Sequence, residues 1–468
     1  IRLPDALLGT VTVFILYLWL SRRLGSLPAL AAALCLAVDP WHVSITRTAH
    51  EAGYAPFFMV MAIWALDRSG LTDDSGSPTP RHWAFLAGIM LAFHAWVYPA
   101  ARLFTPLFCI ALCLLYRQRL GELWRRNDGR RSIAILTLGF VIGTLPLWWT
   151  ALTHRDWLAA RASAAVLDFR PQYFARSLAE FGTNFLKNID PVHLFISAND
   201  MGGAELPGTG LHLLVTAPFI LAGLLRALLR SRNESWYRLL LAWLLLGVVP
   251  AAICGDVNPH ALRTISIVIP IAALAGVGAD WLLVNRNQPT ARYRMTLALI
   301  SLAAISINAG ITGYRYFHTY RIDAEAPYQF SLYNAMQFVA ARQSEADFVL
   351  VTGDSNQPYI YALFCQPVDP RSLAANPIVA AAGPLGFHQV VHVGKYYFMP
   401  KNPTDFPEAR RDFEEAWRSV PAGATGLVVE TPGRFTEGRL LETFHLTKHD
   451  SWDVAYEVRR WRKPGVPR

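Results

Sequence analysis

Residues Leu3–Leu20 read Leu-Pro-Asp-Ala-Leu-Leu-Gly-Thr-Val-Thr-Val-Phe-Ile-Leu-Tyr-Leu-Trp-Leu, with Asp5 as their single charged residue. A membrane-spanning helix needs about 20 predominantly apolar residues, so this stretch predicts a helix that crosses a bilayer. The composition agrees, because 53% of the 468 residues are hydrophobic and 16% are charged. Soluble domains carry about 25% charged residues. We therefore expect a membrane protein.

Similar apolar runs recur along two thirds of the chain. Several are short, and we expect these to be tilted or buried among longer neighbours. The expected helices are Leu3–Leu20, Leu27–Val38, Gly53–Leu66, Trp83–Val97, Leu103–Tyr116, Ser132–Trp149, Leu211–Leu229, Leu239–Cys254, Thr264–Leu283 and Met295–Thr312. They predict an all-α polytopic membrane protein with about ten helices in this chain.

The arginines indicate the orientation of these helices. Most lie in alternate loops, and the opposite short loops hold little beyond Arg47, Arg102 and Arg263. Because cytoplasmic loops collect Lys and Arg, the arginine-rich loops are expected to be cytoplasmic. This pattern accounts for the formal net charge of +9 without a nucleic-acid partner. It also places Ile1 outside, so we expect one more helix before it.

The last third of the chain is polar and has no apolar run of spanning length. Its short apolar runs predict buried strands, and two longer segments predict helices. The expected strands are Phe348–Val351 and Gly426–Glu430, and the expected helices are Tyr333–Arg342 and Asp405–Arg418. We therefore expect two domains: a transmembrane domain over residues 1–313, with an outer loop at 150–210, and an extracytoplasmic α/β domain over residues 314–468.

Titratable residues of both signs gather just after the second apolar run, at Asp39, His42, Arg47, His50 and Glu51. Ionisable groups at a membrane boundary are costly, so they indicate a functional site. Glu51 and Asp39 are candidates for a general base or a metal ligand, and Arg47 is a candidate for holding a phosphate. The structural alternative is that Asp39 caps a helix and Arg47 reaches lipid headgroups.

Two further groups lie at outer boundaries. Tyr98 precedes a proline bend, and Arg102 follows it in a position to meet a lipid phosphate; the alternative is an interfacial anchor. His260 and Arg263 lie three residues apart and share a face if helical. A helix start with such groups suits a phosphate, and a headgroup contact is the alternative. The glycine-bearing loop Phe195–Gly210 is either a lid or a plain connector.

Sequence motifs for common cofactors are absent. The chain has no Walker A motif, no GxGxxG after a strand and no HExxH. Its five cysteines are scattered without a CxxC, which favours small buried side chains over a metal site or a disulfide framework. No cofactor is therefore assigned, and a divalent metal at the carboxylates stays open.

Several motifs together resemble the bacterial lipid-linked-sugar glycosyltransferases of GT-C fold, which include protein O-mannosyltransferases and the aminoarabinose transferase that modifies lipid A. They are Arg2–Gly9, Asp39–His42 through Arg47 and Glu51, Tyr98–Arg102, Glu205–Gly208 and Asn258–Arg263. The resemblance implies a polyprenyl-phosphate sugar donor. It also implies transfer to a lipid, glycan or protein acceptor on the outer face of a bacterial inner membrane. In the family the first outer loop carries the acidic catalytic base, and that loop would precede Ile1.

The resulting hypothesis is an inverting sugar transfer. Arg47, Arg102, His260 and Arg263 steady the departing lipid phosphate, with Tyr98 beside them. Glu51 orients the donor or a metal, and His50 relays a proton. The alternatives are a lipid or sugar transporter, although transporters place their polar groups near the midplane, and a non-catalytic membrane scaffold.

Overall fold

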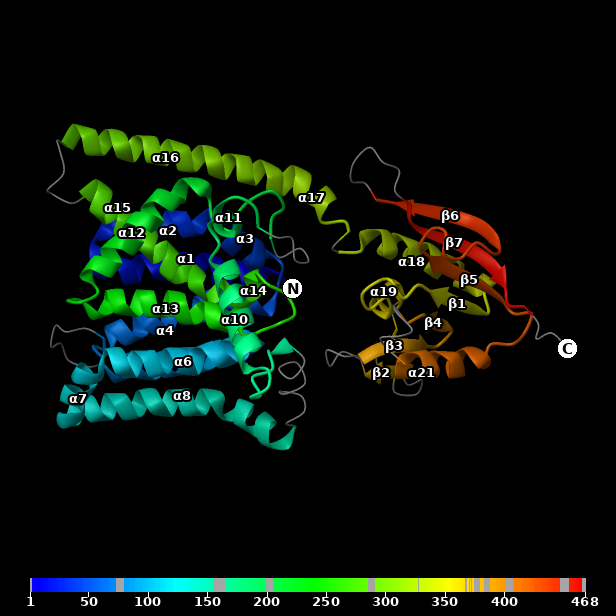
Figure 1. The fold of residues 1–468 in the computed structure, drawn as a ribbon, viewed down its shortest axis with the longest axis horizontal. Helices are drawn as coiled ribbons and strands as arrows, with labels where there is room; N and C mark the ends of the chain where they lie inside the picture. The colour runs from blue at the N-terminus through cyan, green and yellow to red at the C-terminus, as the bar shows by residue number, and fades with distance from the viewer. Residues whose placement is uncertain are drawn as a thin grey trace. The chain divides into compact units, whose positions relative to one another are not determined.

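The structure is a computed structural model that describes residues 2–72, 80–154, 165–198, 205–284, 291–326, 328–366, 368–369, 371, 373, 379–382, 388–400, 407–446 and 454–464. These residues form two compact units, one ending at Phe317 and the other beginning at His318. The first is helical, and the second contains the β-sheet (Figure 1).

The first unit contains the predicted apolar runs as helices, and each of the ten overlaps one. The helices are α1 (Leu3–Leu24), α2 (Ser26–Ala37), α3 (Pro40–Arg47), α4 (Ala55–Arg68), α5 (Arg81–Val97), α6 (Pro99–Leu115), α7 (Arg117–Arg125), α8 (Asn127–Thr153), α10 (Phe174–Asn188), α11 (Pro191–Phe195), α12 (Ala217–Arg230), α13 (Ser235–Ala252), α14 (Ala261–Thr264), α15 (Val268–Ala279), α16 (Ala291–Tyr314) and the single-turn helix η1 (Glu51–Tyr54).

Fewer of these helices have spanning length than the apolar runs predicted. Among the described residues, five are long and apolar enough to cross a membrane, or up to seven if two bent pairs each count as one span. The bends, of 54° and 72°, fall between α2 and α3 and between α6 and α7. By contrast α4, α5 and α12 have 14, 17 and 14 residues, short of the roughly 20 that a crossing needs.

Small residues let the helices approach one another closely. A Cβ on Gly223 of α12 would lie 1.9 Å from the carbonyl oxygen of Leu274 on α15, and one on Gly278 would lie 1.9 Å from that of Phe219. A glycine also allows a close approach between α5 and α8, where a Cβ on Gly88 would lie 2.1 Å from the Leu136 carbonyl oxygen. Such contacts are typical of helices packed in a membrane, where small side chains allow backbone-to-backbone packing.

The two ends of the helical unit hold different helices and different charged residues. The end that holds α7 carries arginines paired with carboxylates, such as Arg226 with Asp280 at 2.5 Å. The other end, where the chain begins, gathers α3, α11 and α14 (Figure 1). The predicted site residues lie at this second end.

The second unit is the expected α/β domain. Its seven-stranded sheet has the order β2-β3-β4-β1-β5-β7-β6. Its elements are α18 (Phe330–Arg342), β1 (Phe348–Val351), α19 (Tyr359–Cys365), β2 (Val379–Ala382), β3 (His388–Val393), β4 (Tyr396–Phe398), α21 (Pro407–Arg418), β5 (Thr425–Glu430), β6 (Arg439–His445) and β7 (Val454–Arg462). The central strand β1 is parallel to both neighbours, β4 and β5.

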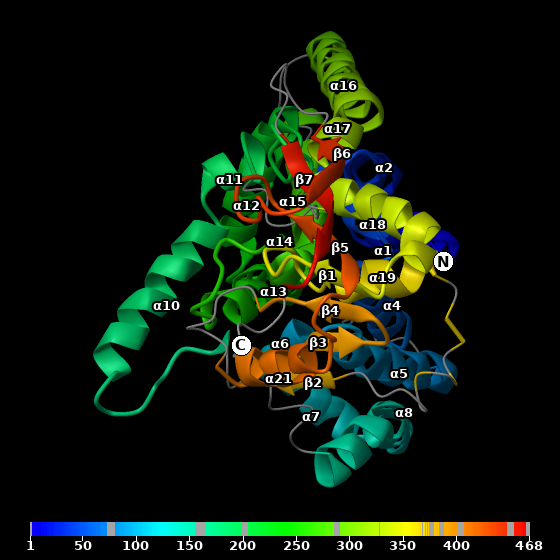
Figure 2. The same cartoon turned by 90° about the vertical axis from the view of Figure 1, so that its right-hand side faces the viewer.

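Alternation along β1 explains why both faces of this sheet are covered. Val349 and Val351 belong to the cluster that includes α18 and α19, whereas Phe348 and Leu350 belong to the cluster that includes α21. Successive side chains of a strand point to opposite faces, so the helices pack on the two sides of the strands (Figure 2).

Candidate functional site

The turn after α3 presents His50 and Glu51 together. The Nδ1 atom of His50 accepts a hydrogen bond from the Ala52 amide at 3.1 Å and so caps η1. The imidazole packs edge-on against the ring of Tyr98, with centroids 5.6 Å apart. Glu51 follows with its side chain 55% exposed, 3.5 Å from the imidazole. A titratable ring and a solvated carboxylate therefore lie side by side, next to a phenol.

The loop before α14 is held in place by amide side chains. The His260 amide donates to the Asn188 side-chain oxygen at 3.0 Å, and the Asn188 side chain donates to Asn258 at 2.8 Å. The Asn258 side chain in turn donates to the Cys254 carbonyl at 2.7 Å. Because Asn188 ends α10, that helix fixes the backbone that leads to His260 and Arg263.

Arg263 forms a two-point ion pair with Asp256. The guanidinium NH1 and NH2 groups lie 2.5 and 2.6 Å from the two carboxylate oxygens. Burial opposes ionisation of Asp256, but hydrogen bonds from Arg263 and from backbone amides hold the pKa of this carboxyl below its usual range. The pair fixes the plane of the guanidinium, a geometry that also suits phosphate.

His260 lies beside this pair as a neutral imidazole. Burial, with the nearby Arg263 charge, lowers its pKa to about 4, so it serves at neutral pH as a hydrogen-bonding group rather than as a cation. Its Nδ1 atom is buried and has no hydrogen-bond partner among the described residues. The expected cationic contribution at this position therefore comes from Arg263 alone.

These groups meet at one end of the helical unit. His260 lies within electrostatic reach of His50, and Arg263 within reach of Tyr98. We name this cluster the polar rim; its members are His50, Glu51, Tyr98, Asp256, His260 and Arg263. Stretches more than 150 residues apart in the chain thus supply one cluster of both signs.

The other two predicted arginines have different surroundings. Arg47 lies with its guanidinium carbon 4.2 Å from the ring centroid of Tyr316, a cation–π contact. Arg102 is exposed on α6, one helical turn after Tyr98. That they share one anion site with Arg263 stays a prediction. The contact with Tyr316 had no signal in the sequence, because Tyr316 lies far away along the chain.

Asp39 occupies a structural position. Its Oδ1 atom accepts from the His42 amide at 3.0 Å, which caps α3, and its Oδ2 atom lies 2.5 Å from Nδ1 of His212. The carboxylate is 7% exposed. Both oxygens are therefore engaged, which favours the capping alternative over the catalytic one. The sequence did not single out His212.

The glycine-bearing loop is described at its two ends, and residues 199–204 lie outside the described residues. The Ala198 amide donates to the Thr209 carbonyl at 2.8 Å, and the Arg315 guanidinium donates to the Gly208 carbonyl. His94 is buried, with contacts of 2.8 Å to Thr105 and 3.0 Å to Ser266, as expected of a packed polar group.

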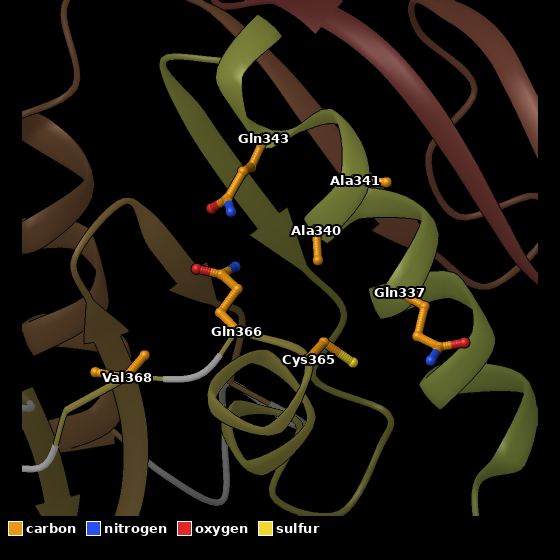
Figure 3. A pocket seen from close by; sticks show the side chains of 7 residues that line it. All are labelled: Gln337, Ala340, Ala341, Gln343, Cys365, Gln366 and Val368. Carbon is orange, nitrogen blue, oxygen red and sulfur yellow. The ribbon is translucent and has the colours of Figure 1, made fainter.

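No cluster of three or more His, Cys, Asp or Glu side chains arranged to hold a metal occurs among the described residues. A cavity of about 550 Å³ lies in the second unit between α18 and the end of α19. Figure 3 shows the side chains that line it, including Gln337, Gln343 and Gln366. Its lining contains no predicted site residue.

Comparisons with known proteins agree with this architecture. Residues 1–149 match the family model described as dolichyl-phosphate-mannose-protein mannosyltransferase. A search of curated protein sequences found no match.

Among solved structures, the fold is similar to apo ArnT from Cupriavidus metallidurans. The TM-score is 0.54 at 13% identity, and the alignment covers 98% of this chain and 83% of that one. It is also similar to the same protein bound to undecaprenyl phosphate, with a TM-score of 0.53 at 11% identity and the same two coverages.

The expected resemblance is confirmed: residues 1–149 match the model of the dolichyl-phosphate-mannose-protein mannosyltransferase family, and the chain has the fold of ArnT.

Proposed function

We propose that this protein transfers a sugar from a polyprenyl-phosphate donor to an acceptor at the extracytoplasmic face of a bacterial inner membrane. The observation that carries the proposal is the polar rim, which joins residues from distant stretches at one end of a helical unit with the ArnT fold. The solved complex of ArnT with undecaprenyl phosphate supports the class of donor lipid. The C-terminal α/β domain would then lie on the same outer side.

The polar rim contains groups that hold the donor in such a transfer. The acceptor oxygen attacks the anomeric carbon with inversion, its proton passes to a carboxylate base, and the bond to the lipid phosphate breaks. Arg263, held by Asp256, offsets the negative charge that develops on the departing phosphate. The neutral His260 adds a hydrogen bond, and the exposed Glu51 orients the donor.

The chain offers a matched pair of arginines to test this assignment. Arg263 and Arg226 each form an ion pair with an aspartate at 2.5 Å, and they lie at opposite ends of the helical unit. We expect Arg263→Ala to reduce transfer from a radiolabelled polyprenyl-phosphate sugar by about 100-fold or more, as loss of one transition-state donor does. Arg226→Ala should leave transfer nearly unchanged.

Two outcomes would contradict the proposal. Equal turnover of Arg263→Ala and wild type would remove Arg263 from the leaving-group role. Binding of undecaprenyl phosphate without any sugar transfer would instead favour a transporter or a non-catalytic scaffold.

A further inference from the structure

Asp5, in the first turn of α1, is a buried carboxylate that the proposed reaction does not yet use. Its exposed fraction is 0%. The Ala49 backbone amide gives it a weak hydrogen bond, but neither Oδ1 nor Oδ2 has a partner at full hydrogen-bond geometry within the described residues. An unsatisfied buried acceptor costs about 1–3 kcal/mol, and more when charged, so its presence requires an explanation.

This carboxylate lies directly behind the turn that carries His50 and Glu51. A Cβ on Gly53 would lie 2.7 Å from Oδ1 of Asp5, so any side chain at this position would have to displace the carboxylate. One turn further along α1, a Cβ on Gly9 would lie 2.9 Å from the Cβ of Thr46. The first two turns of α1 thus pack tightly against α3 and the turn after it.

The same turn contains a second costly feature. Ala49 has φ of 56°, in the left-handed region that residues with a Cβ rarely adopt. Such a backbone costs on the order of 1–3 kcal/mol and persists where the surrounding structure enforces it, often at ligand-binding sites. A strained residue and a carboxylate without a well-formed hydrogen bond therefore occur together at one short turn.

The chemistry of Asp5 limits what it can bind. An ionised carboxylate only accepts hydrogen bonds, so it repels the phosphate of a lipid donor and attracts hydroxyl or ammonium groups. Three metal ligands do not gather around it among the described residues. Sugar hydroxyls, or the ammonium of an amino sugar, are the groups of the donor that match.

We propose that Asp5 is a sugar-binding carboxylate, covered in the lipid-free protein by the turn Ala49–Gly53. When the donor binds, the turn moves and the two oxygens of Asp5 accept hydrogen bonds from the sugar. This assignment rests on the proposed function and divides recognition in two: Arg263 and His260 hold the phosphate, and Asp5 holds the sugar.

Chemical labelling of the full chain tests whether Asp5 can be reached. Dicyclohexylcarbodiimide enters apolar surroundings and reacts with a carboxylate through its protonated fraction, and peptide mass spectrometry locates the product. The matched control is Asp67, which is 5% exposed but bonded to Arg23 and Thr72. We expect labelling at Asp5 and none at Asp67.

Polyprenyl-phosphate mannose at about ten times its Kd should slow the labelling of Asp5 about tenfold, because its sugar covers the carboxylate and only the unoccupied protein reacts. Labelling of Asp5 as slow as that of Asp67, or unchanged by the lipid, would overturn the proposal.

Binding measurements with Asp5→Asn separate the sugar from the lipid. The variant should bind undecaprenyl phosphate as wild type does, and bind polyprenyl-phosphate mannose about 10-fold or more weakly, since hydrogen bonds to a charged group are lost. Equal weakening for both lipids, or none for either, would refute the assignment. Failure of wild type to bind undecaprenyl phosphate would instead contradict the proposed function.

Discussion

The two ends of α1 handle a buried carboxylate in opposite ways. Near its last turn, the Arg23 guanidinium pairs with Asp67 of α4, and the Thr72 hydroxyl donates to the same carboxylate at 2.9 Å. In its first turn, Asp5 is equally buried and is left unsatisfied. The first arrangement joins two helices, whereas the second retains its capacity to bind a group from outside. The difference separates a carboxylate that stabilises the fold from one that is available for recognition.

The largest effect is expected when the ion pair between Arg23 and Asp67 is broken. Asp67→Asn leaves Arg23 without its counter-charge, and breaking a buried ion pair costs about 3–5 kcal/mol. Because Arg23 keeps 21% exposure, we expect a loss of about 3 kcal/mol in the free energy of unfolding. Asp5→Asn should leave that free energy unchanged or raise it. Denaturant unfolding in detergent micelles, followed by tryptophan fluorescence, measures both, and an equal loss in the two variants would invalidate the comparison.

A smaller effect is expected at Asp39, whose bonds resemble those of Asp67 rather than those of Asp5. Asp39→Ala removes the cap of α3 and the partner of His212, and should cost about 2 kcal/mol. Asp39→Asn keeps a capping oxygen, so it should retain both stability and sugar transfer. A normally folded Asp39→Asn protein without transfer would restore the catalytic interpretation.

The effect that is smallest at neutral pH, and that grows only in acid, concerns His260. The pKa of His260 is lowered to about 4 in the folded protein, against about 6.5 for an unperturbed histidine. The unfolded chain therefore binds more protons between these values, and stability falls as the pH is lowered from about 6.5 towards 4. His260→Gln should flatten this part of the curve of melting temperature against pH. An unchanged slope would mean that His260 is not buried as a neutral ring.

The sequence predicted where helices and strands occur because each kind of element follows a local pattern of apolar residues. Apolar length located the helices, and the predicted short strands Phe348–Val351 and Gly426–Glu430 are confirmed as β1 and as part of β5. The number of spans could not be read in this way, since α4, α5 and α12 are apolar but too short to cross. How each short helix packs against its neighbours is a tertiary effect: most of α4 is buried, whereas α12 keeps Leu221, Leu225 and Leu228 exposed.

The candidate site was predictable as a set of residues but not as a set of contacts. His50, Tyr98 and Arg263 were singled out from their places at boundaries, and the structure brings them together. Asn188 positions this site from 72 residues away along the chain, so only the fold shows its role. Asp256 is close to Arg263 in sequence, but their ion pair depends on the turn between them. Asp5 was visible as the single charge in its apolar run, yet its burial against Gly53 depends on a turn nearly 50 residues later.

The glycine contacts between α12 and α15 bear on whether the protein or a bound lipid donor changes its position during binding. Where two backbones are in contact, no side chain lies between them that could change its rotamer. If these helices slid past one another, their backbone atoms would therefore overlap. The short helix that carries Arg263 leads through a single 3₁₀ turn into α15 and inherits this rigidity. If Arg263 holds the donor phosphate as proposed, the lipid headgroup must adjust its own position to the guanidinium, and any local movement is left to the loops of the polar rim.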